Sequence, residues 1–387
     1  METLTWTYDE LGTLVAADGL ALAHDAMGRV TSTVCHAATH GAAYDAAGRL
    51  AELDYGGVMA VTYQYEPGTA RVTNQFDSLT GTWIACDYDA RGRLAGIRRS
   101  SGQNAVFTRN EDGSLARITD GTVLDLEYTY DANGRVASVA GTWPLETGPA
   151  LAGETNAWTY DAAGQISSAG YAYNDRGQCT ASPGRTLAWL DDRPAAIDGM
   201  NLAYSGLDHL LELDGTPTPT RLYYNLGLGD VPVRENNRLY VWSPAGRLLY
   251  FVDLDGGNAV CFYHPDANGS MLAVSDGSGT VVQAHAYDPF GQIVAESGDL
   301  QQPFTFGGET GLLRFDDLVA PGPLRKNGGG AEDLYINGKK PQAAKTQAEY
   351  EAKAAEIDRN IAIYDALIAE DAAELKRWSE EAARIGD

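Results

Sequence analysis

Residues 126 to 139 read LEYTYDANGRVASV, and variants of this stretch recur along the 387-residue chain. On both sides of the central YDANGR segment, apolar and polar residues alternate, which is typical of a half-buried β-strand. Between the two runs, an aspartate can accept backbone N–H groups and a glycine can adopt positive φ, so the segment predicts a tight turn. Each such stretch is therefore expected to form one antiparallel hairpin, with Gly134 and Gly164 at positive φ and Tyr130 at least half buried.

The pattern Tyr-Asp-x-x-Gly occurs intact six times, and degenerate copies fill the gaps between the intact ones. Copies that begin at residues 8, 24, 44, 65, 88, 109 and 130 follow one another at a period near 21 residues. A unit of this length holds about two strands and two turns. One unit cannot bury a face alone, so neighbouring units must pair into one sheet. The intact copies are Tyr8-Asp9…Gly12, Tyr44-Asp45…Gly48, Tyr88-Asp89…Gly92, Tyr130-Asp131…Gly134, Tyr160-Asp161…Gly164 and Tyr287-Asp288…Gly291.

Composition and charge exclude several classes of function. The chain has 28 basic and 53 acidic residues, a net charge of −25, which argues against a nucleic-acid-binding protein. It has no run of about 18 apolar residues, so no membrane span is predicted. Residues 1 to 9 lack the pattern of a secretory signal peptide, so export by a non-classical route is expected. The four cysteines are widely scattered, which favours small core side chains over a metal or redox site.

The repeats resemble the YD-repeat family, also called rearrangement hotspot (RHS) repeats, over roughly residues 1 to 310. The resemblance implies a long antiparallel β-strip that spirals into a hollow shell. Members of that family carry C-terminal toxins in bacterial secretion systems, form subunits of insecticidal toxin complexes or occur in cell-surface adhesion proteins.

A second group of motifs resembles the conserved core that closes the shell in that family. After Leu313 the chain departs from this pattern, and Gly322-Pro323 stands where Asp-Pro is expected. The acidic pair that would serve self-cleavage cannot be assembled from matching positions, so we predict no autoproteolysis and no enzymatic activity. The core motifs are Tyr287-Asp288-Pro289-Phe290-Gly291, Pro303-Phe304-Thr305-Phe306-Gly307 and Glu309-Thr310-Gly311-Leu312.

The last 42 residues, 346–387, have a different composition. Apolar residues recur there at spacings of four and three, which predicts a helix with a heptad seam. The helix either forms a coiled coil with another copy or a partner, docks on its own sheet, or belongs to a toxin fragment. The seam residues are Tyr350, Ile357, Ile361, Tyr364, Ile368, Leu375 and Trp378.

The remaining motifs point weakly to chemistry. His36 and His40 have a spacing that suits a metal on a helix, but the surrounding residues favour a loop. Asp253 to Gly256 resembles a calcium loop, but His264 replaces the required glutamate, so a hairpin turn is favoured. The arginine after each repeat glycine is expected to lie across a tyrosine ring or a neighbouring aspartate. No metal and no cofactor are predicted. The paired carboxylates Asp191-Asp192 and Asp316-Asp317 are expected in solvated turns.

The sequence therefore predicts an all-β repeat protein: an antiparallel hairpin strip that forms a partial or complete hollow shell, with a helical tail. The expected domains are a repeat domain over 1–313 with its core signature at 263–313, a Gly/Pro-rich core end and linker over 314–345, and the tail over 346–387. The expected role is to encapsulate, carry or present a cargo in a bacterial or phage-associated secretion or toxin-delivery system. The alternatives are an adhesive module that binds a carbohydrate or cell-surface receptor, as in a phage tail fibre or surface-exposed protein, and a self-cleaving core. The expected partners are a protein cargo and, through the tail helix, a second copy.

Overall fold

The computed structural model describes residues 4–145, 159–191, 193–214, 218–287, 291, 293–315, 318–321 and 335–336. The chain divides into a larger unit, residues 1–155 and 172–341, and a smaller unit, residues 156–171 and 342–387. In the smaller unit, the described residues form the repeat copy at Tyr160, where an isolated bridge joins Tyr160 to Ile166. The predicted seam from Tyr350 to Trp378 lies outside the described residues.

The first sheet of the larger unit is an antiparallel meander in which every strand pairs with its neighbours in sequence. Its fourteen strands are β1 (Trp6–Tyr8), β2 (Leu14–Ala17), β3 (Leu20–His24), β4 (Val30–Cys35), β5 (Ala38–Tyr44), β6 (Leu50–Asp54), β7 (Ala60–Tyr65), β8 (Val72–Asp77), β9 (Trp83–Tyr88), β10 (Leu94–Arg99), β11 (Ala105–Arg109), β12 (Leu115–Asp120), β13 (Leu124–Tyr130) and β14 (Val136–Thr142).

The second sheet repeats the same topology. Its fourteen strands are β15 (Ala172–Tyr173), β16 (Cys179–Ser182), β17 (Arg185–Leu190), β18 (Arg193–Ile197), β19 (Met200–Tyr204), β20 (Leu210–Asp214), β21 (Thr220–Tyr224), β22 (Pro232–Glu235), β23 (Arg238–Trp242), β24 (Leu248–Asp253), β25 (Ala259–Pro265), β26 (Met271–Asp276), β27 (Val281–Tyr287) and β28 (Ile293–Ser297). The predicted all-β antiparallel architecture is confirmed for the described residues.

A short 3₁₀ turn, η1 (Gly308–Thr310), and a three-stranded sheet follow the second sheet. The strands of the small sheet are β29 (Leu312–Phe315), β30 (Leu318–Pro321) and β31 (Tyr335–Ile336). Glycine and proline in the predicted core end and linker, 314–345, favour loop, but β30 and β31 of this segment are strands. The backbone of β30 pairs with β29 on one side and β31 on the other, so glycine and proline punctuation did not prevent strand pairing.

In the five intact copies whose aspartate the structure describes, this aspartate builds the repeat turn. In the copy at Asp131, the backbone N–H of Asp131 donates to the carbonyl of Arg135 (2.8 Å) and that of Gly134 donates to the carbonyl of Asp131 (3.0 Å). The Asp131 carboxylate accepts the N–H groups of Asn133 and Arg135. Gly134 has a φ of 77° and the register shifts at Tyr130, so the loop is a type I turn closed by a glycine bulge.

The arginine and tyrosine of successive copies link one hairpin to the next. Arg49 donates to the carboxylate of Asp45 at 2.8 Å, and its guanidinium lies 4.4 Å from the ring centre of Tyr65 in the following copy. The Tyr65 hydroxyl donates to the carbonyl of Leu50 at 2.6 Å. The predicted placement of the arginine, on an aspartate and across a tyrosine, is confirmed here and at Arg29. Arg71 also lies over a tyrosine ring, that of Tyr88, but its ion pair is with Glu66. Equivalent hydroxyl bonds join Tyr44 to Val30, Tyr88 to Val72, Tyr130 to Leu115, Tyr224 to Leu210 and Tyr287 to Met271.

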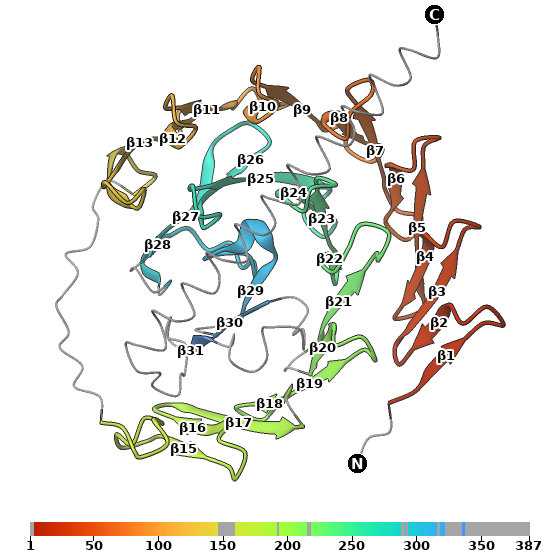
Figure 1. Ribbon diagram of the computed structural model, residues 1–387, viewed down its shortest axis with the longest axis vertical. Coiled ribbons are helices and arrows are strands. Elements are labelled where there is room, and N and C mark those ends of the chain that lie inside the picture. Colours follow the sequence, from red (N-terminus) through yellow and green to blue (C-terminus); the bar gives the residue numbers. More distant parts are fainter. Residues whose placement is uncertain are drawn as a thin grey trace, which may run out of the picture. The chain divides into compact units, whose positions relative to one another are not determined.

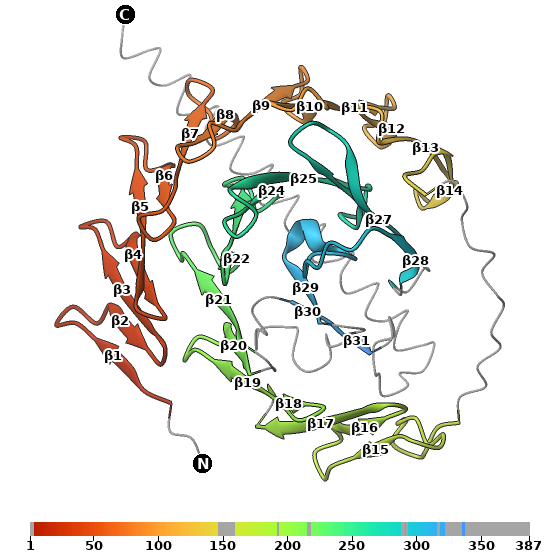
Figure 2. The same cartoon turned by 180° about the vertical axis from the view of Figure 1, so that it is seen from behind.

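The two sheets of the larger unit pack face to face. Figures 1 and 2 show β21–β27 alongside β4–β13, and one apolar cluster joins Leu53, Val61 and Ile84 of the first sheet to Leu239 and Val241 of the second. Buried hydroxyls tie the layers together, because Tyr55 donates to the carbonyl of Tyr240 (3.0 Å) and Tyr63 to that of Trp242 (3.1 Å). The core therefore lies between the sheets.

Candidate functional site

The core motifs predicted from the sequence come together on the second sheet. Residues 300 to 314, which we call the docked segment, cross β23–β27 and bond to strands and turns along the way. In this segment, the carbonyl of Thr305 accepts the N–H of Met271 (2.9 Å), and the N–H of Glu309 donates to the carbonyl of Gly269 (3.0 Å). Arg238 donates to the carbonyl of Gln301 at 2.5 Å. The docked segment therefore covers the face of the second sheet that points away from the first.

Phe304 anchors the docked segment. Its side chain is fully buried, and its ring packs edge-on against Tyr240 and Trp242, at centroid distances of 4.7 and 5.4 Å. Tyr263 contributes a third edge contact. Aromatic pairs of this geometry add stabilisation beyond the area that they bury.

Gly291 of the first core motif lies against the second motif. Its φ is 88°, and a Cβ atom added there would lie 2.5 Å from the ring of Phe306. The Phe306 ring also contacts Tyr287 edge-on at 5.9 Å. Only glycine permits both this backbone conformation and this approach, so the two core motifs are physically coupled.

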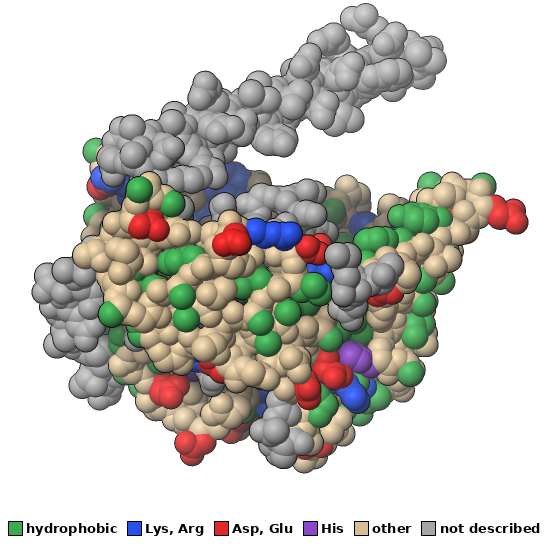
Figure 3. All heavy atoms as spheres, turned by 90° about the horizontal axis from the view of Figure 1, so that it is seen from below, with side chains coloured by type: hydrophobic (Ala, Val, Ile, Leu, Met, Phe, Trp, Pro, Cys, Tyr) green, Lys and Arg blue, Asp and Glu red, His purple; other side chains and the backbone are tan. Residues whose placement is uncertain are grey.

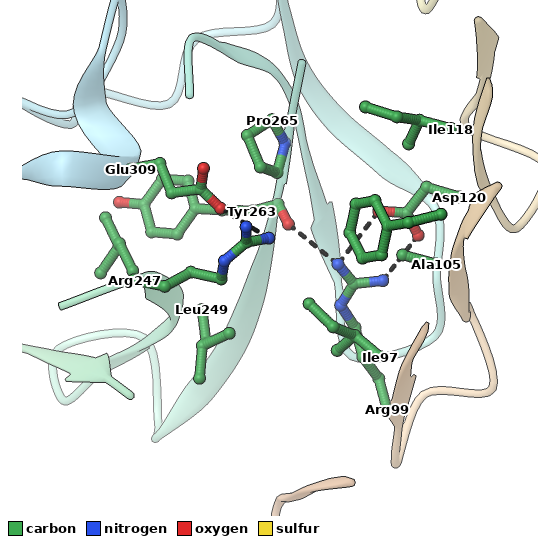
Figure 4. Close-up of a pocket in the computed structure, with 12 residues that line it drawn as sticks. Ile97, Arg99, Ala105, Ile118, Asp120, Arg247, Leu249, Tyr263, Pro265 and Glu309 are labelled. Carbon is green, nitrogen blue, oxygen red and sulfur yellow. Dashed lines mark hydrogen bonds and ion pairs between the residues drawn. The ribbon is translucent and has the colours of Figure 1, made fainter. Parts of the chain in front are cut away.

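Glu309 of the third core motif forms an ion pair with Arg247. The guanidinium and carboxylate lie 2.9 Å apart, and Arg247 also lies over the ring of Phe107 on β11 (5.5 Å). Burial raises the pKa of Glu309, while Arg247 opposes that rise. Figure 4 shows both side chains at a small pocket between the two sheets. Through Arg247, the docked segment is thus connected to the first sheet.

A second ion pair fills the other end of this pocket (Figure 4). Arg99 on β10 donates two hydrogen bonds to Asp120 on β12, at 2.6 and 3.0 Å, and a third to the carbonyl of Tyr263 on β25, at 3.3 Å. Both charged side chains are only 3% exposed. Burial alone would raise the pKa of Asp120, but Arg99 and His264 outweigh it and hold the pKa below its usual value.

His264 connects Asp120 to Ser275. Its Nδ1 atom lies 2.8 Å from the Asp120 carboxylate, and its Nε2 atom lies 2.8 Å from the Ser275 hydroxyl. This order of groups matches a serine–histidine–aspartate triad. However, all three residues are buried between the layers, and Arg99 already neutralises Asp120. Burial lowers the pKa of His264, and Asp120 offsets that effect only in part. The arrangement suits a layer contact rather than a nucleophile that meets substrate.

The repeat-turn residues predicted from the sequence lie at separate hairpin ends and form no common site. The predicted positive φ is observed at Gly134 (77°) and Gly164 (76°). Tyr130 is half-buried, as predicted, whereas Tyr8 and Tyr160 are exposed. Asp288 lies outside the described residues. The turn glycines with positive φ are Gly12, Gly48, Gly92, Gly134, Gly164 and Gly291.

The predicted loop at His36 and His40 is wrong for His40, which lies buried on β5. His36 and Ala37 have φ of 47° and 61°, so they form a two-residue turn that directly connects β4 to β5. Asp253 lies at the end of β24, and its carboxylate accepts the N–H groups of the following turn, as predicted for a hairpin. Asp191 lies in a turn, while Asp192, Asp316 and Asp317 lie outside the described residues.

Sequence reasoning missed the Arg99–Asp120 pair. Asp77, Arg99 and Asp120 each end an even-numbered strand, so they hold equivalent positions in successive repeats. Three successive repeats thus carry a buried charged residue at this position, a signal that alignment of the copies would have exposed. Cys35 holds the same position on β4 and is buried. Three of the four cysteines are buried, all four are free, and the expectation of small core side chains is confirmed for Cys35, Cys179 and Cys261.

In the part of the chain that the structure describes, no group of three or more histidine, cysteine, aspartate or glutamate side chains is placed to hold a metal ion. Among the same residues, no helix is long and apolar enough to cross a membrane. Acidic side chains are spread in small groups over the face drawn in Figure 3.

No family model matches the chain, and no curated protein matches it. Among solved structures, a TcdB2–TccC3–TEV structure is 15% identical with a TM-score of 0.40 and covers 88% of this chain and 20% of that chain. A TcdB2–TccC3 structure (15%, TM-score 0.39) covers 88% and 22%. A Photorhabdus luminescens Tc holotoxin pore with a variant TccC3 (15%, TM-score 0.39) covers 88% and 21%. The chain thus spans about a fifth of these chains, and membership of the YD-repeat family stays a prediction.

Proposed function

We propose that the protein is a structural repeat scaffold: a wall of β-hairpins that encapsulates, carries or presents a protein cargo in a secretion or toxin-delivery system. The observation that carries this proposal is the layered packing of the docked segment, residues 300 to 314, on the second sheet, which itself packs on the first sheet. A scaffold of this kind requires rigid packing of its layers and does not require a catalytic site. The buried ion pairs, the layer-spanning tyrosines and the repeat links of the larger unit all serve rigidity.

The proposed role is non-enzymatic. The most triad-like arrangement among the described residues, Asp120–His264–Ser275, is buried and holds the layers together. Asp316 and Asp317 are adjacent in sequence, and Gly322 occupies the position where the resemblance requires an acidic residue for self-cleavage.

The partner that we propose is a protein cargo, and the setting is a bacterium or phage whose secreted, surface-exposed or virion-associated proteins use a non-classical route. This part of the proposal follows from the resemblance of the repeats to the YD-repeat family. The predicted helix of residues 346–387 would then hold a partner or a second copy. Deletion of this segment, followed by light scattering, tests that role: the truncated protein is expected to be smaller in assembly state than the full chain.

One observation favours the adhesive alternative. Phe76 on β8 and Trp83 on β9 are direct cross-strand partners, and they are 47% and 42% exposed. Two neighbouring exposed rings on a sheet can stack on a sugar, and exposed apolar patches often mark interaction sites. If adhesion is the function, glycan-array binding should be detected and should be lost in Trp83→Ala.

Limited proteolysis tests the rigid wall. In the full chain, trypsin should cut slowly at Arg238 and Arg247, because the docked segment bonds to both side chains. Phe304→Ala removes the anchor of the docked segment at a cost of about 3–5 kcal/mol, and we expect it to accelerate those cuts at least about tenfold.

Phe76→Ala is the matched control, because it removes the same ring from an exposed position, and the cuts should stay slow in this variant. Rapid cutting of the unmodified chain, or equal rates in all three proteins, would contradict a rigid wall held by the docked segment.

A further inference from the structure

His40 is a buried base without a partner. It lies on β5, is 0% exposed, and neither ring nitrogen forms a hydrogen bond. The ring of Tyr223 on β21 meets it edge-on at 5.8 Å. A Cβ atom added at Gly56, in the turn after β6, would lie 3.6 Å from His40 and 3.9 Å from the Arg234 guanidinium. His40 is therefore enclosed by elements of both sheets.

The charges around His40 do not favour a proton on it. Arg234 on β22 lies over the ring of Tyr223, at 4.9 Å from its centre, and its positive charge opposes protonation of His40. The carboxylate and the backbone of Asp54, at the end of β6, favour protonation but are outweighed, and the carboxylate already accepts the N–H of Gly57. Tyr223 also contacts the ring of His36 at 5.0 Å, and the Nε2 atom of His36 lies 2.9 Å from the carbonyl oxygen of Leu211.

The contact around His40 is close and is held by few bonds. The Asn225 amide donates to the carbonyl of Gly41 at 2.8 Å, and the N–H of Leu226 donates to the Thr33 hydroxyl at 2.9 Å. A Cβ atom added at Gly227 would come within 2.3 Å of the Ala42 side chain. A charged imidazole could gain hydration here only if β5 moved away from β21 and β22.

We propose that this contact is an acid-sensitive seam: uptake of a proton by His40 separates β5 from β21 and β22 and loosens the packing of the two sheets. This behaviour goes beyond the proposed function and does not depend on the nature of any cargo. Water reaching the imidazole would hydrate the new charge, which the closed seam cannot do.

The direction of the pH effect follows from linkage. Burial, with help from Arg234, lowers the pKa of His40 from 6.5 to about 4 in the closed seam. The open form therefore binds more protons than the closed form between these values, and the closed form loses stability as the pH falls. For these two pKa values, the opening equilibrium constant rises about 20-fold between pH 7 and pH 5.

The response should spare the part of the sheet interface around His264. His264, the other buried histidine of the sheet interface described above, has the carboxylate of Asp120 at 2.8 Å, so a proton there meets an anion. His40 has no such contact. The seam at β5 should consequently open at a pH at which the Arg99–Asp120 contact between β10, β12 and β25 stays closed.

Hydrogen exchange measured by mass spectrometry on the full chain tests the proposal. After correction for the intrinsic pH dependence of exchange, amides of β5 and β21 should exchange about 20-fold faster at pH 5 than at pH 7. Amides of β12 and β25 should change less than about twofold. In His40→Leu the increase at β5 and β21 should disappear, and in the control His24→Leu, on β3, it should persist.

Three results would overturn the proposal: no increase at β5 in the unmodified protein, the same increase at β12 and β25, or an increase that persists in His40→Leu. If His40→Leu does not fold, the profile of the unmodified chain alone decides between the first two results and the expected one.

Discussion

Replacing Asp120 by asparagine removes one charge and leaves the shape of the side chain almost unchanged. Arg99 would then keep a full positive charge at 3% exposure, with only the neutral carbonyls of Gln103 and Tyr263 and the new amide as acceptors. Breaking a buried ion pair in this way costs about 3–5 kcal/mol, because the surviving charge is left uncompensated. We expect Asp120→Asn to lower the free energy of unfolding by that amount.

Urea unfolding followed by tryptophan fluorescence measures this loss. Asp125→Asn is the matched control, because Asp125 pairs with Arg117 at a surface position where the side chains are 38% and 45% exposed. Exposed pairs contribute about 0–1 kcal/mol, so the control should unfold almost like the unmodified protein. The double variant Arg99→Met with Asp120→Leu should recover most of the stability, because it buries no charge. Equal effects of Asp120→Asn and Asp125→Asn would refute the assignment of Asp120 to the layer contact.

Three further predictions concern the turns, the repeat links and the integrity of the chain. Gly134→Val should cost about 1–3 kcal/mol in urea unfolding; the cost comes from backbone strain alone, because no atom lies within 4 Å of an added Cβ, and an unchanged midpoint would contradict it. Tyr65→Phe deletes the hydroxyl that donates to Leu50 and should cost about 0.5–1.5 kcal/mol, whereas a gain in thermal stability would show that the link is dispensable. Purified protein should run as one band at 41.3 kDa; a spontaneous cut between residues 312 and 335 that Asp316→Asn abolishes would establish self-cleavage instead.

The hairpins could be predicted from the sequence because their determinants are local. Asp131 and Gly134 lie three residues apart, and together they define a turn without help from the rest of the chain. The alternating run before the turn, β13, then defines which residues face the core. The run after it was also expected to be half-buried, but β14 is mostly exposed on both faces. The arginine contact with aspartate and tyrosine was also predictable, because Arg49 is close in sequence to Asp45 and one repeat away from Tyr65.

The packing of one sheet on the other could not be predicted, because its determinants are distant in the chain. Asp120 and His264 are 144 residues apart, as the numbering shows, and no local pattern joins them. One signal was present: residues 239 to 242 and 248 to 252 are almost entirely apolar instead of alternating. Strands of this kind are covered on both faces, and β23 and β24 are indeed buried on both.

The docked segment shows the same limit. The motif containing Phe304 was predicted to belong to a closing core, but the residues that receive its ring, Tyr240, Trp242 and Tyr263, were not identified from the sequence. They lie on strands 40 to 65 residues upstream, so their meeting depends on the order of strands in the sheet. The contacts of a repeat can be read from one copy, whereas the contacts between layers require the assembled fold.

Electron microscopy of the purified full-length protein tests the proposed wall most directly. We predict compact particles with a low-density interior bounded by layered density. Phe304→Ala should open or broaden these particles. Extended ribbons or fibres without an enclosed interior would contradict the encapsulating role.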